Sequence, residues 1–241
     1  MLRLVLLSLA LTGCAQKSEL DAANERIKSL EEKVATLEKA PAAKGAAPAA
    51  SSEEEEAAGK LMQEVQEAVK GNDYATAKTK LADLTGKYAG TRAGKAAVRM
   101  ASEINLVGTD AGPIEAEKWF QGNADFSKSK ATLVVFWEVW CPHCKKELPK
   151  LAEDEAKLKA KGVQIVAMTK VTKSSTDEKV EEFIKESKAK FPIGKEKDGS
   201  MSKAYAVSGI PAAALVKDGK VIWRGHPARL DDATIDKLLA G

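Results

Sequence analysis

Cysteine, histidine and aromatic residues are scarce in this chain of 241 residues, which has three cysteines, two histidines and 5% aromatic side chains. Three cysteines cannot form a framework of several disulfides, and a site of four Cys or His ligands would use nearly all of both residue types. Long apolar runs are also lacking. The longest, near the N-terminus, has roughly a dozen residues and is too short to cross a bilayer as a helix. We therefore expect neither a disulfide-stapled fold nor a membrane-spanning helix.

A strong excess of one charge is lacking as well. Lysine and arginine number 38 and aspartate and glutamate 35, a formal net charge of +3. The lysines are scattered among glutamates, so the electrostatic footprint of a nucleic-acid-binding protein is missing. We therefore expect no nucleic-acid partner.

The N-terminal segment 1–13, MLRLVLLSLALTG, has the pattern of a secretory signal peptide: one basic residue, an apolar run and small residues at its end. LTGC at 11–14 resembles the lipobox of bacterial lipoproteins, which implies that Cys14 is lipidated and becomes the mature N-terminus. The lipid would anchor the protein in a bacterial membrane, on its periplasmic face. Ala15, directly after the lipidated cysteine, favours the outer membrane.

Segment 14–39 is expected to be the lipidated N-terminus and a stalk. Within residues 18–39, SELDAANERIKSLEEKVATLEK, apolar side chains occupy the a and d positions of three heptads. This pattern predicts a coiled coil that forms a homodimer or homotrimer. Three heptads are close to the minimum length, so a stalk without a partner helix is the alternative.

Segment 40–56 is rich in Ala, Pro, Gly and Ser and has no apolar period, which predicts a flexible linker. Its last four residues are glutamates, which can also open a helix because negative charge suits the helix N-terminus. From 57 to 111, apolar residues recur at helical spacing, with breaks at 71–72 and 90–91. This segment resembles a tetratricopeptide-type helix pair with a further helix; a small helical spacer is the alternative.

Strand and helix patterns alternate from 112 to 241. Buried strands are predicted at 132–137, 163–168, 212–217 and 221–224, and amphipathic helices at 142–161, 177–190 and 231–240. The last two strands flank the turn residues Asp218 and Gly219. Strands separated by helices of this length predict an α/β domain with a mixed sheet flanked by helices.

Two of the three cysteines lie three residues apart in FWEVWCPHCKKELPKL, residues 136–151. A buried strand leads to Cys141, and Pro142 suits the first turn of the following helix. Cys141 is therefore expected at a helix N-terminus, where the dipole and nearby His143 favour a thiolate and lower the thiol pKa. Cys144 would lie one turn deeper on the same face, placed to attack a mixed disulfide formed at Cys141.

Other uses of this cysteine pair fit its surroundings less well. A structural disulfide would close a very short loop and add little stability. A zinc or copper site could use Cys141, Cys144 and His143, but His226 has the pattern of a surface turn residue and no second CxxC is present. Haem attachment would need a histidine directly after Cys144. We expect a redox centre without a metal.

The motif FWxxWCxxCKKELP and its surroundings, about 114–241, resemble the thioredoxin-fold thiol-disulfide oxidoreductases of the membrane-anchored TlpA/ResA type. Pro149 matches the helix-kinking proline of that family, and Ile210-Pro211 matches its cis-proline. The resemblance implies that Ile210 and Pro211 bind an extended substrate segment. It also implies that Trp140 forms an apolar face beside the cysteines.

Glu147 matches an acidic residue near the cysteines of the ResA group, which implies that it accepts a proton from Cys144. The buried aspartate of thioredoxin itself is replaced by Val135, and Glu138 is a weaker candidate acceptor. Pro142 and His143 form the dipeptide found between the cysteines of the strongly oxidising DsbA type, whereas the surrounding motif resembles that of the reductases. The direction of electron flow therefore stays open, with reduction favoured.

The resemblance and the lipobox together imply an extracytoplasmic thiol-disulfide oxidoreductase in which Cys141 is the nucleophile and Cys144 resolves the mixed disulfide. It would need no cofactor beyond its redox-active disulfide. Its partners would be exported proteins with thiols or disulfides, and a membrane thiol protein that donates or accepts electrons. Two alternatives remain: a copper or other metal carrier that uses the same dithiol, and a structural tether that recruits a partner through 57–111.

Overall fold

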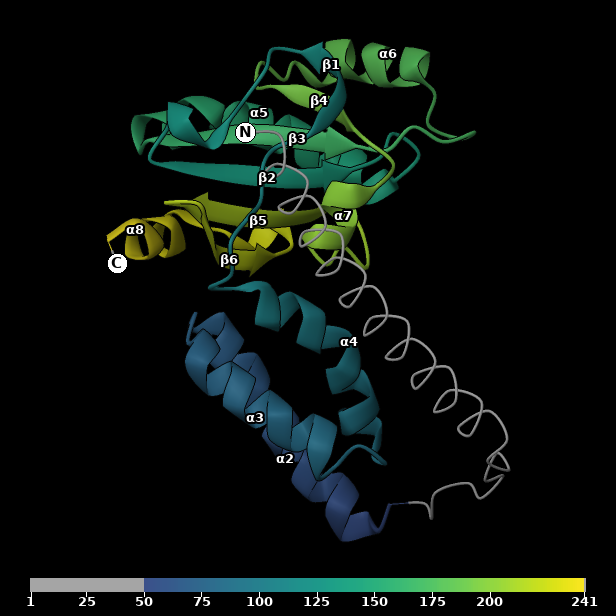
Figure 1. The fold of residues 1–241 in the computed structure, drawn as a ribbon, viewed down its shortest axis with the longest axis vertical. Helices are drawn as coiled ribbons and strands as arrows, with labels where there is room; N and C mark the ends of the chain where they lie inside the picture. Colours follow the sequence, from purple (N-terminus) through teal and green to yellow (C-terminus); the bar gives the residue numbers. More distant parts are fainter. Residues whose placement is uncertain (1–49, 241) are drawn as a thin grey trace, which may run out of the picture. The chain divides into compact units, whose positions relative to one another are not determined.

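The computed structural model describes residues 50–240, which all belong to one structural unit. Three helices come first in this part of the chain, and a six-stranded sheet with its own helices follows (Figure 1). The predicted signal peptide 1–13, the lipid site Cys14 and the stalk 14–39 lie outside the described residues. Most of the predicted linker 40–56 does so too.

Residues 52–106 form a helical module. Its helices are α2 (Ser52–Lys70), α3 (Tyr74–Gly86) and α4 (Arg92–Leu106). Each begins after a residue whose side chain accepts a hydrogen bond from a first-turn N–H, namely Ser51, Asp73 and Thr91. The breaks between the helices lie where the sequence predicts them. The resemblance to a tetratricopeptide pair stays a prediction.

Helix α2 begins earlier than the predicted linker 40–56 allows. Ser51 and Glu54 form a capping box, in which each side chain accepts a hydrogen bond from the other residue's N–H. Three glutamates in the first turn add favourable charge at the positive end of the helix dipole. Residues 52–56 therefore belong to a helix and not to a linker, and the glutamate run opens that helix.

The sheet has the strand order β1-β4-β3-β2-β5-β6. Its strands are β1 (Ala116–Gln121), β2 (Ala131–Trp137), β3 (Val163–Thr169), β4 (Ile193–Glu196), β5 (Ala212–Lys217) and β6 (Lys220–Gly225). Strands β2, β3 and β4 are parallel, whereas β1, β5 and β6 each pair antiparallel with a neighbour. This is the predicted mixed sheet, with two strands, β1 and β4, that the sequence did not predict.

Helices and turns accompany the sheet. They are η1 (Phe126–Lys128), α5 (Pro142–Ala160), α6 (Asp177–Ser187), α7 (Ser200–Ala204), η2 (Pro227–Arg229) and α8 (Asp232–Ala240), where η denotes a 3-10 turn. Helix α6 ends three residues before the predicted end at 190, because Lys188 adopts a left-handed conformation with φ of 57° and stops the helix.

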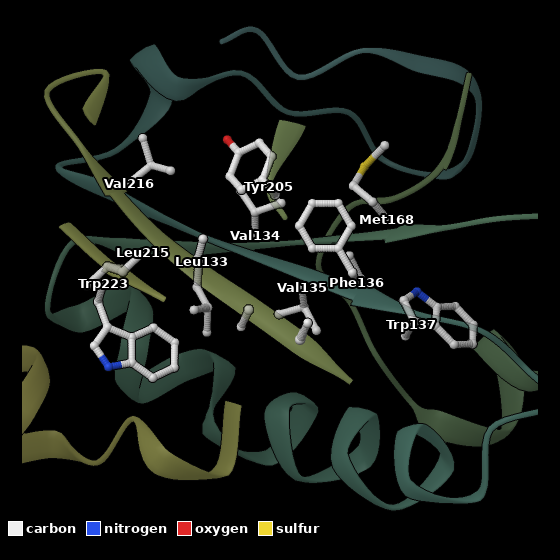
Figure 2. Packing of buried hydrophobic residues seen from close by; sticks show 14 of the residues in the cluster. Leu133, Val134, Val135, Phe136, Trp137, Met168, Tyr205, Leu215, Val216 and Trp223 are labelled. Atoms are coloured by element: carbon white, nitrogen blue, oxygen red, sulfur yellow. The ribbon is translucent and has the colours of Figure 1, made fainter. Parts of the chain in front are cut away.

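Strand β2 is the centre of the hydrophobic core, since all of its residues are buried. Val134 and Phe136 point to one face of the sheet, the side of Tyr205, whereas Leu133 and Val135 point to the other (Figure 2). The rings of Phe136 and Tyr205 lie 5.2 Å apart. Burial on both faces explains the continuous apolar run of this strand.

A short connector joins the helical module to the outer edge of the sheet. The N–H of Gly108 donates to the Val221 carbonyl at 2.7 Å, and the N–H of Val221 donates to the Thr109 carbonyl at 3.0 Å. Asp110 forms a further bridge to β6, and α4 also packs against this strand. The connector 108–110 therefore covers part of the edge of β6.

Candidate active site

Cys141 lies between the end of β2 and the start of α5. The N–H of Cys141 donates to the Glu138 carbonyl at 3.0 Å, which closes a turn after the strand. Cys141 is the N-cap of α5, because its Sγ accepts a hydrogen bond from the Cys144 N–H at 3.3 Å. Pro142 occupies the first turn. The sulfur of Cys141 thus lies at the positive end of a 19-residue helix, where the sequence predicts it.

The second cysteine lies deeper in the protein. Both residues are thiols in this structure, with Cys141 3% exposed and Cys144 fully buried. Burial raises the pKa of the Cys144 thiol well above its ordinary value, because a thiolate there would lose its hydration. The contact with Cys141 and the negative charge of Glu138 raise this pKa as well. Cys144 therefore keeps its proton at neutral pH.

A cis-proline loop lies against the first cysteine. The Ile210-Pro211 peptide bond is cis, and the Ile210 carbonyl oxygen lies 3.7 Å from the Cys141 Sγ. Pro211 is buried and Ile210 is half-buried. The fold thus brings together residues that are 69 positions apart in the chain, in the arrangement that the resemblance implied.

Two of the predicted site residues lie at the surface beside the cysteines. Trp140 is 53% exposed, and its Nε1 donates to a carboxylate oxygen of Glu138 at 2.6 Å. His143 is exposed in the first turn of α5. An exposed indole next to a buried thiol offers an apolar surface to a partner polypeptide. The contact with Glu138, which orients the indole, was missed from the sequence because nothing in the residue spacing signals it.

The two candidate proton acceptors have different surroundings. Glu147 is 9% exposed, and its carboxylate pairs with Lys150 at 3.0 Å. It lines a cavity of about 340 Å³ between α5, η2 and α8. Glu138, the weaker candidate from the sequence, is a carboxylate whose charge acts on Cys144. This charge is the smallest of the contributions that raise the pKa of Cys144, and a hydrogen bond from the Glu138 backbone lowers that pKa.

Two further predicted residues have defined positions. Pro149 lies inside α5 and has no N–H, so the carbonyl of Lys145 lacks its helical donor. His226 is half-buried and caps η2, because its Nδ1 accepts a hydrogen bond from the Ala228 N–H at 3.2 Å.

Among residues 50–240, no group of three or more His, Cys, Asp or Glu side chains is placed to hold a metal ion. In the same range, no helix is long and apolar enough to span a membrane.

Known proteins resemble this part of the chain. Residues 107–224 match the AhpC/TSA family. Over 96 residues, the chain is 41% identical to thiol-disulfide oxidoreductase ResA of Bacillus thuringiensis subsp. konkukian (strain 97-27). The aligned residues make up 39% of this chain and 54% of the relative. Over 92 residues, the chain is 34% identical to sporulation thiol-disulfide oxidoreductase A of Bacillus subtilis (strain 168). This alignment covers 38% of this chain and 56% of the relative. The chain thus spans about half the length of the curated relatives that it matches.

A solved structure of similar sequence is a thiol:disulfide interchange protein from a Bacteroides species, 25% identical, with a TM-score of 0.46. The similarity covers 56% of this chain and 91% of that one. The fold itself follows from the strand order, the β5-β6 hairpin and the cis-proline that faces the CxxC motif. Residues 107–224 match the AhpC/TSA family, and this part of the chain has the thioredoxin-like fold.

Proposed function

We propose that this chain is an extracytoplasmic thiol-disulfide oxidoreductase that acts on exported proteins. The observation that carries the proposal is the position of the Cys141 Sγ, at the N-terminus of α5 and 3.7 Å from the Ile210 carbonyl of the cis-proline loop. The names of the relatives, which are thiol-disulfide oxidoreductases, support the same reaction. The cysteine pair itself carries both electrons, so the reaction needs no other cofactor.

In the reducing direction, the Cys141 thiolate attacks one sulfur of a substrate disulfide. A bond forms between these two sulfurs, the substrate S–S bond breaks, and the other substrate sulfur leaves with the electron pair. Cys144 then gives up its proton and attacks the Cys141 sulfur, which releases the second substrate thiolate. The Cys141-Cys144 disulfide that remains would be reduced by a membrane thiol protein.

The burial of Cys144 separates these two steps. Its thiol keeps its proton while Cys141 attacks, and a base must take that proton before the mixed disulfide can resolve. Glu138 is supported as this base by its charge on Cys144, and Glu147 by its buried position one turn further along α5. Comparing the resolution rates of Glu138→Gln and Glu147→Gln chains would separate the two.

Substrate binding is assigned to the surface around the sulfur. An extended substrate segment would form backbone hydrogen bonds at Ile210, next to Pro211, because extended backbone pairs with extended backbone. The exposed indole of Trp140 would supply apolar contact on the other side of the cysteine.

Capture of the exchange intermediate tests the proposed function directly. A chain with Cys144→Ser should accumulate a mixed disulfide with a disulfide-bonded test protein such as insulin, because Cys141 can attack but nothing resolves the product. The adduct would appear on a non-reducing gel and disappear with dithiothreitol. The matched control, Cys141→Ser, should capture nothing. A Cys144→Ser chain that forms no adduct would argue against the proposal.

The direction of electron flow is tested by the reduction potential of the Cys141/Cys144 pair, measured in defined thiol-disulfide buffers. We expect a value of about −270 mV or below, as for a reductant supplied by a membrane donor. A value of about −120 mV would instead mean that the protein donates disulfides to its clients, as the Pro142-His143 dipeptide would favour.

The membrane location is proposed from residues 1–14 alone. A lipid on Cys14 would hold the redox site at the periplasmic face of a bacterial membrane, with the outer membrane favoured by Ala15. Fractionation of cells that express a Cys14→Ser chain tests this, since loss of the lipid should release the protein from the membrane fraction.

A further inference from the structure

A cavity of about 250 Å³ lies between the helical module and the sheet that positions the cysteines. Tyr74 of α3 and Met100 and Glu103 of α4 line it on the module side. Pro211 and Arg229 line it on the other side. One wall therefore comes from helices that precede the thioredoxin fold in the chain.

The cavity adjoins the loop that faces the reactive sulfur. Gly209 and Pro211 both line it, and they flank Ile210, whose carbonyl oxygen lies 3.7 Å from the Cys141 Sγ. An extended polypeptide rises about 3.3 Å per residue. A substrate segment paired with Ile210 would therefore reach the cavity within a few residues of its reacting cysteine.

The cavity lining carries an excess of positive charge. Its only acidic residue, Glu103, lies 3.6 Å from the guanidinium of Arg224, so these two charges compensate each other. Arg229 is exposed and takes part in none of the ion pairs among residues 50–240. His226 also lines the cavity, and because its Nδ1 accepts from the Ala228 N–H, the neutral ring offers Nε2–H as a donor.

A second observation points to a missing acceptor. Tyr74 is 9% exposed, and its hydroxyl has no hydrogen-bond partner among the described residues. Leaving a buried hydroxyl without a partner is costly. Tyr74, Arg224 and Arg229 line the same cavity. Burial raises the pKa of Tyr74, whereas the backbone of Arg224 and the charges of Arg229 and Arg224 lower it. A carboxylate placed there would accept from the hydroxyl and pair with Arg229.

We propose that this cavity is a specificity subsite that takes a glutamate-like side chain of an extended substrate segment. The carboxylate would bind the Tyr74 hydroxyl and Arg229, and the methylene groups would pack on Met100 and Ile104, which line the same cavity. The inference rests on the proposed exchange reaction at Cys141. It adds that the helical module contributes to the choice of substrate.

The test uses the full reduced chain and synthetic peptides of extended sequence. Each peptide carries one cysteine as a mixed disulfide with thionitrobenzoate, and a glutamate, glutamine or lysine at one of the next five positions on either side. Attack of the Cys141 thiolate on the peptide sulfur forms the Cys141-peptide disulfide, breaks the peptide-thionitrobenzoate bond and releases coloured thionitrobenzoate with the electron pair. The measured quantity is the second-order rate constant of this release.

At one peptide position, we expect glutamate to react about tenfold faster than glutamine, the size of effect that a hydrogen bond to a charged group gives. Lysine at that position should be slowest. Tyr74→Phe and Arg229→Gln should each reduce the ratio of the glutamate rate constant to the glutamine rate constant.

Two control variants match these changes outside the cavity. Tyr88→Phe removes a hydroxyl from another tyrosine of the module, and Arg99→Gln removes an exposed cation of α4; both should keep the full preference for glutamate. Equal rates for glutamate and glutamine at every position, or a preference that survives both cavity variants, would overturn the subsite and leave the proposed function intact. Absence of release from every peptide would overturn the proposed function and the subsite with it.

Discussion

The two sulfurs of the CxxC motif differ in what surrounds them, and this difference suits two successive steps. The Sγ of Cys141 receives an N–H at the start of a helix and faces the cis-proline loop. Cys144 lies fully buried behind it, where its thiol is hard to ionise. In the proposed reaction, Cys141 would therefore attack the substrate, and Cys144 would keep its proton until a mixed disulfide has formed.

The titration of Cys144 should be visible in the stability of the reduced protein. Burial raises its folded pKa above the ordinary thiol value of 9.0. Above that pH, the unfolded chain releases the Cys144 proton and the folded chain retains it. The contribution of Cys144 to the free energy of unfolding is therefore complete at lower pH and is lost as pH rises through the folded pKa. We expect the thermal unfolding midpoint of the reduced protein to fall more steeply between about pH 8.5 and 10 than that of Cys144→Ala. Parallel pH profiles would contradict this.

The parts of the site that the sequence predicts are those fixed by local motifs. The helix N-cap at Cys141 follows from a buried strand and Pro142, and the cis bond at Pro211 follows from the resemblance. The contact of Glu138 with the Trp140 indole and the buried position of Arg224 depend on how distant segments pack. An arginine in a short strand has the pattern of a surface charge, so its burial could not be predicted from its neighbours.

At the scale of elements, α3 and α4 meet through a glycine. A Cβ atom added at Gly94 would lie 2.0 Å from the Tyr88 carbonyl oxygen and 2.9 Å from the Leu84 carbonyl oxygen. Both contacts are with backbone, which cannot swing aside as a long side chain can. Close packing of these two helices therefore requires glycine at this position.

Gly94→Ala should lower the free energy of unfolding by about 1–3 kcal/mol, the usual cost of forcing extra volume into a packed contact. Urea denaturation of the full chain would measure it. Gly59→Ala is the matched control, because it lies within α2 and its added Cβ meets nothing within 4 Å. It should raise the free energy of unfolding by about 0.5–1 kcal/mol through helix propensity. Equal destabilisation by both changes would argue against the contact.

The sequence predicts four of the six strands to within two residues, because each is an apolar run bounded by turn residues. Strands β1 and β4 do not have this pattern. Strand β1 lies at an edge and carries charged residues, and β4 has only four residues, including a glycine. A Cβ at Gly194 would lie 3.2 Å from the Trp119 ring of the paired strand. The reason for this glycine thus lies in a partner strand that only the fold identifies.

At the scale of the whole described unit, a buried charge ties the helical module to the sheet. The Arg224 side chain is 2% exposed, lies 3.6 Å from Glu103 of α4, and donates to the carbonyls of Tyr205 and Ala206 at 3.0 and 3.2 Å. Burial lowers the pKa of Arg224, and the charge of Glu103 opposes this. The guanidinium therefore depends on groups from both parts of the chain.

Arg224→Leu should lower the free energy of unfolding by about 3–5 kcal/mol, since it leaves buried carbonyls without donors and Glu103 without its cation. Urea denaturation followed by circular dichroism would measure the change. The exposed Arg99 of α4 supplies the control, because Arg99→Leu should stay within about 0.5 kcal/mol of the wild type. A similarly small effect of Arg224→Leu would mean that Arg224 does not couple the module to the sheet.

The connector 108–110 affects whether copies of the chain can associate edge to edge. An outer strand with free N–H and C=O groups is a template on which another chain can add, and edge-to-edge addition is a route to aggregation. Here the chain's own connector occupies part of the outer edge of β6 through the hydrogen bonds of Gly108 and Thr109 with Val221. Cutting the chain at residue 112, the predicted start of the α/β domain, would uncover that edge and leave an aggregation-prone fragment.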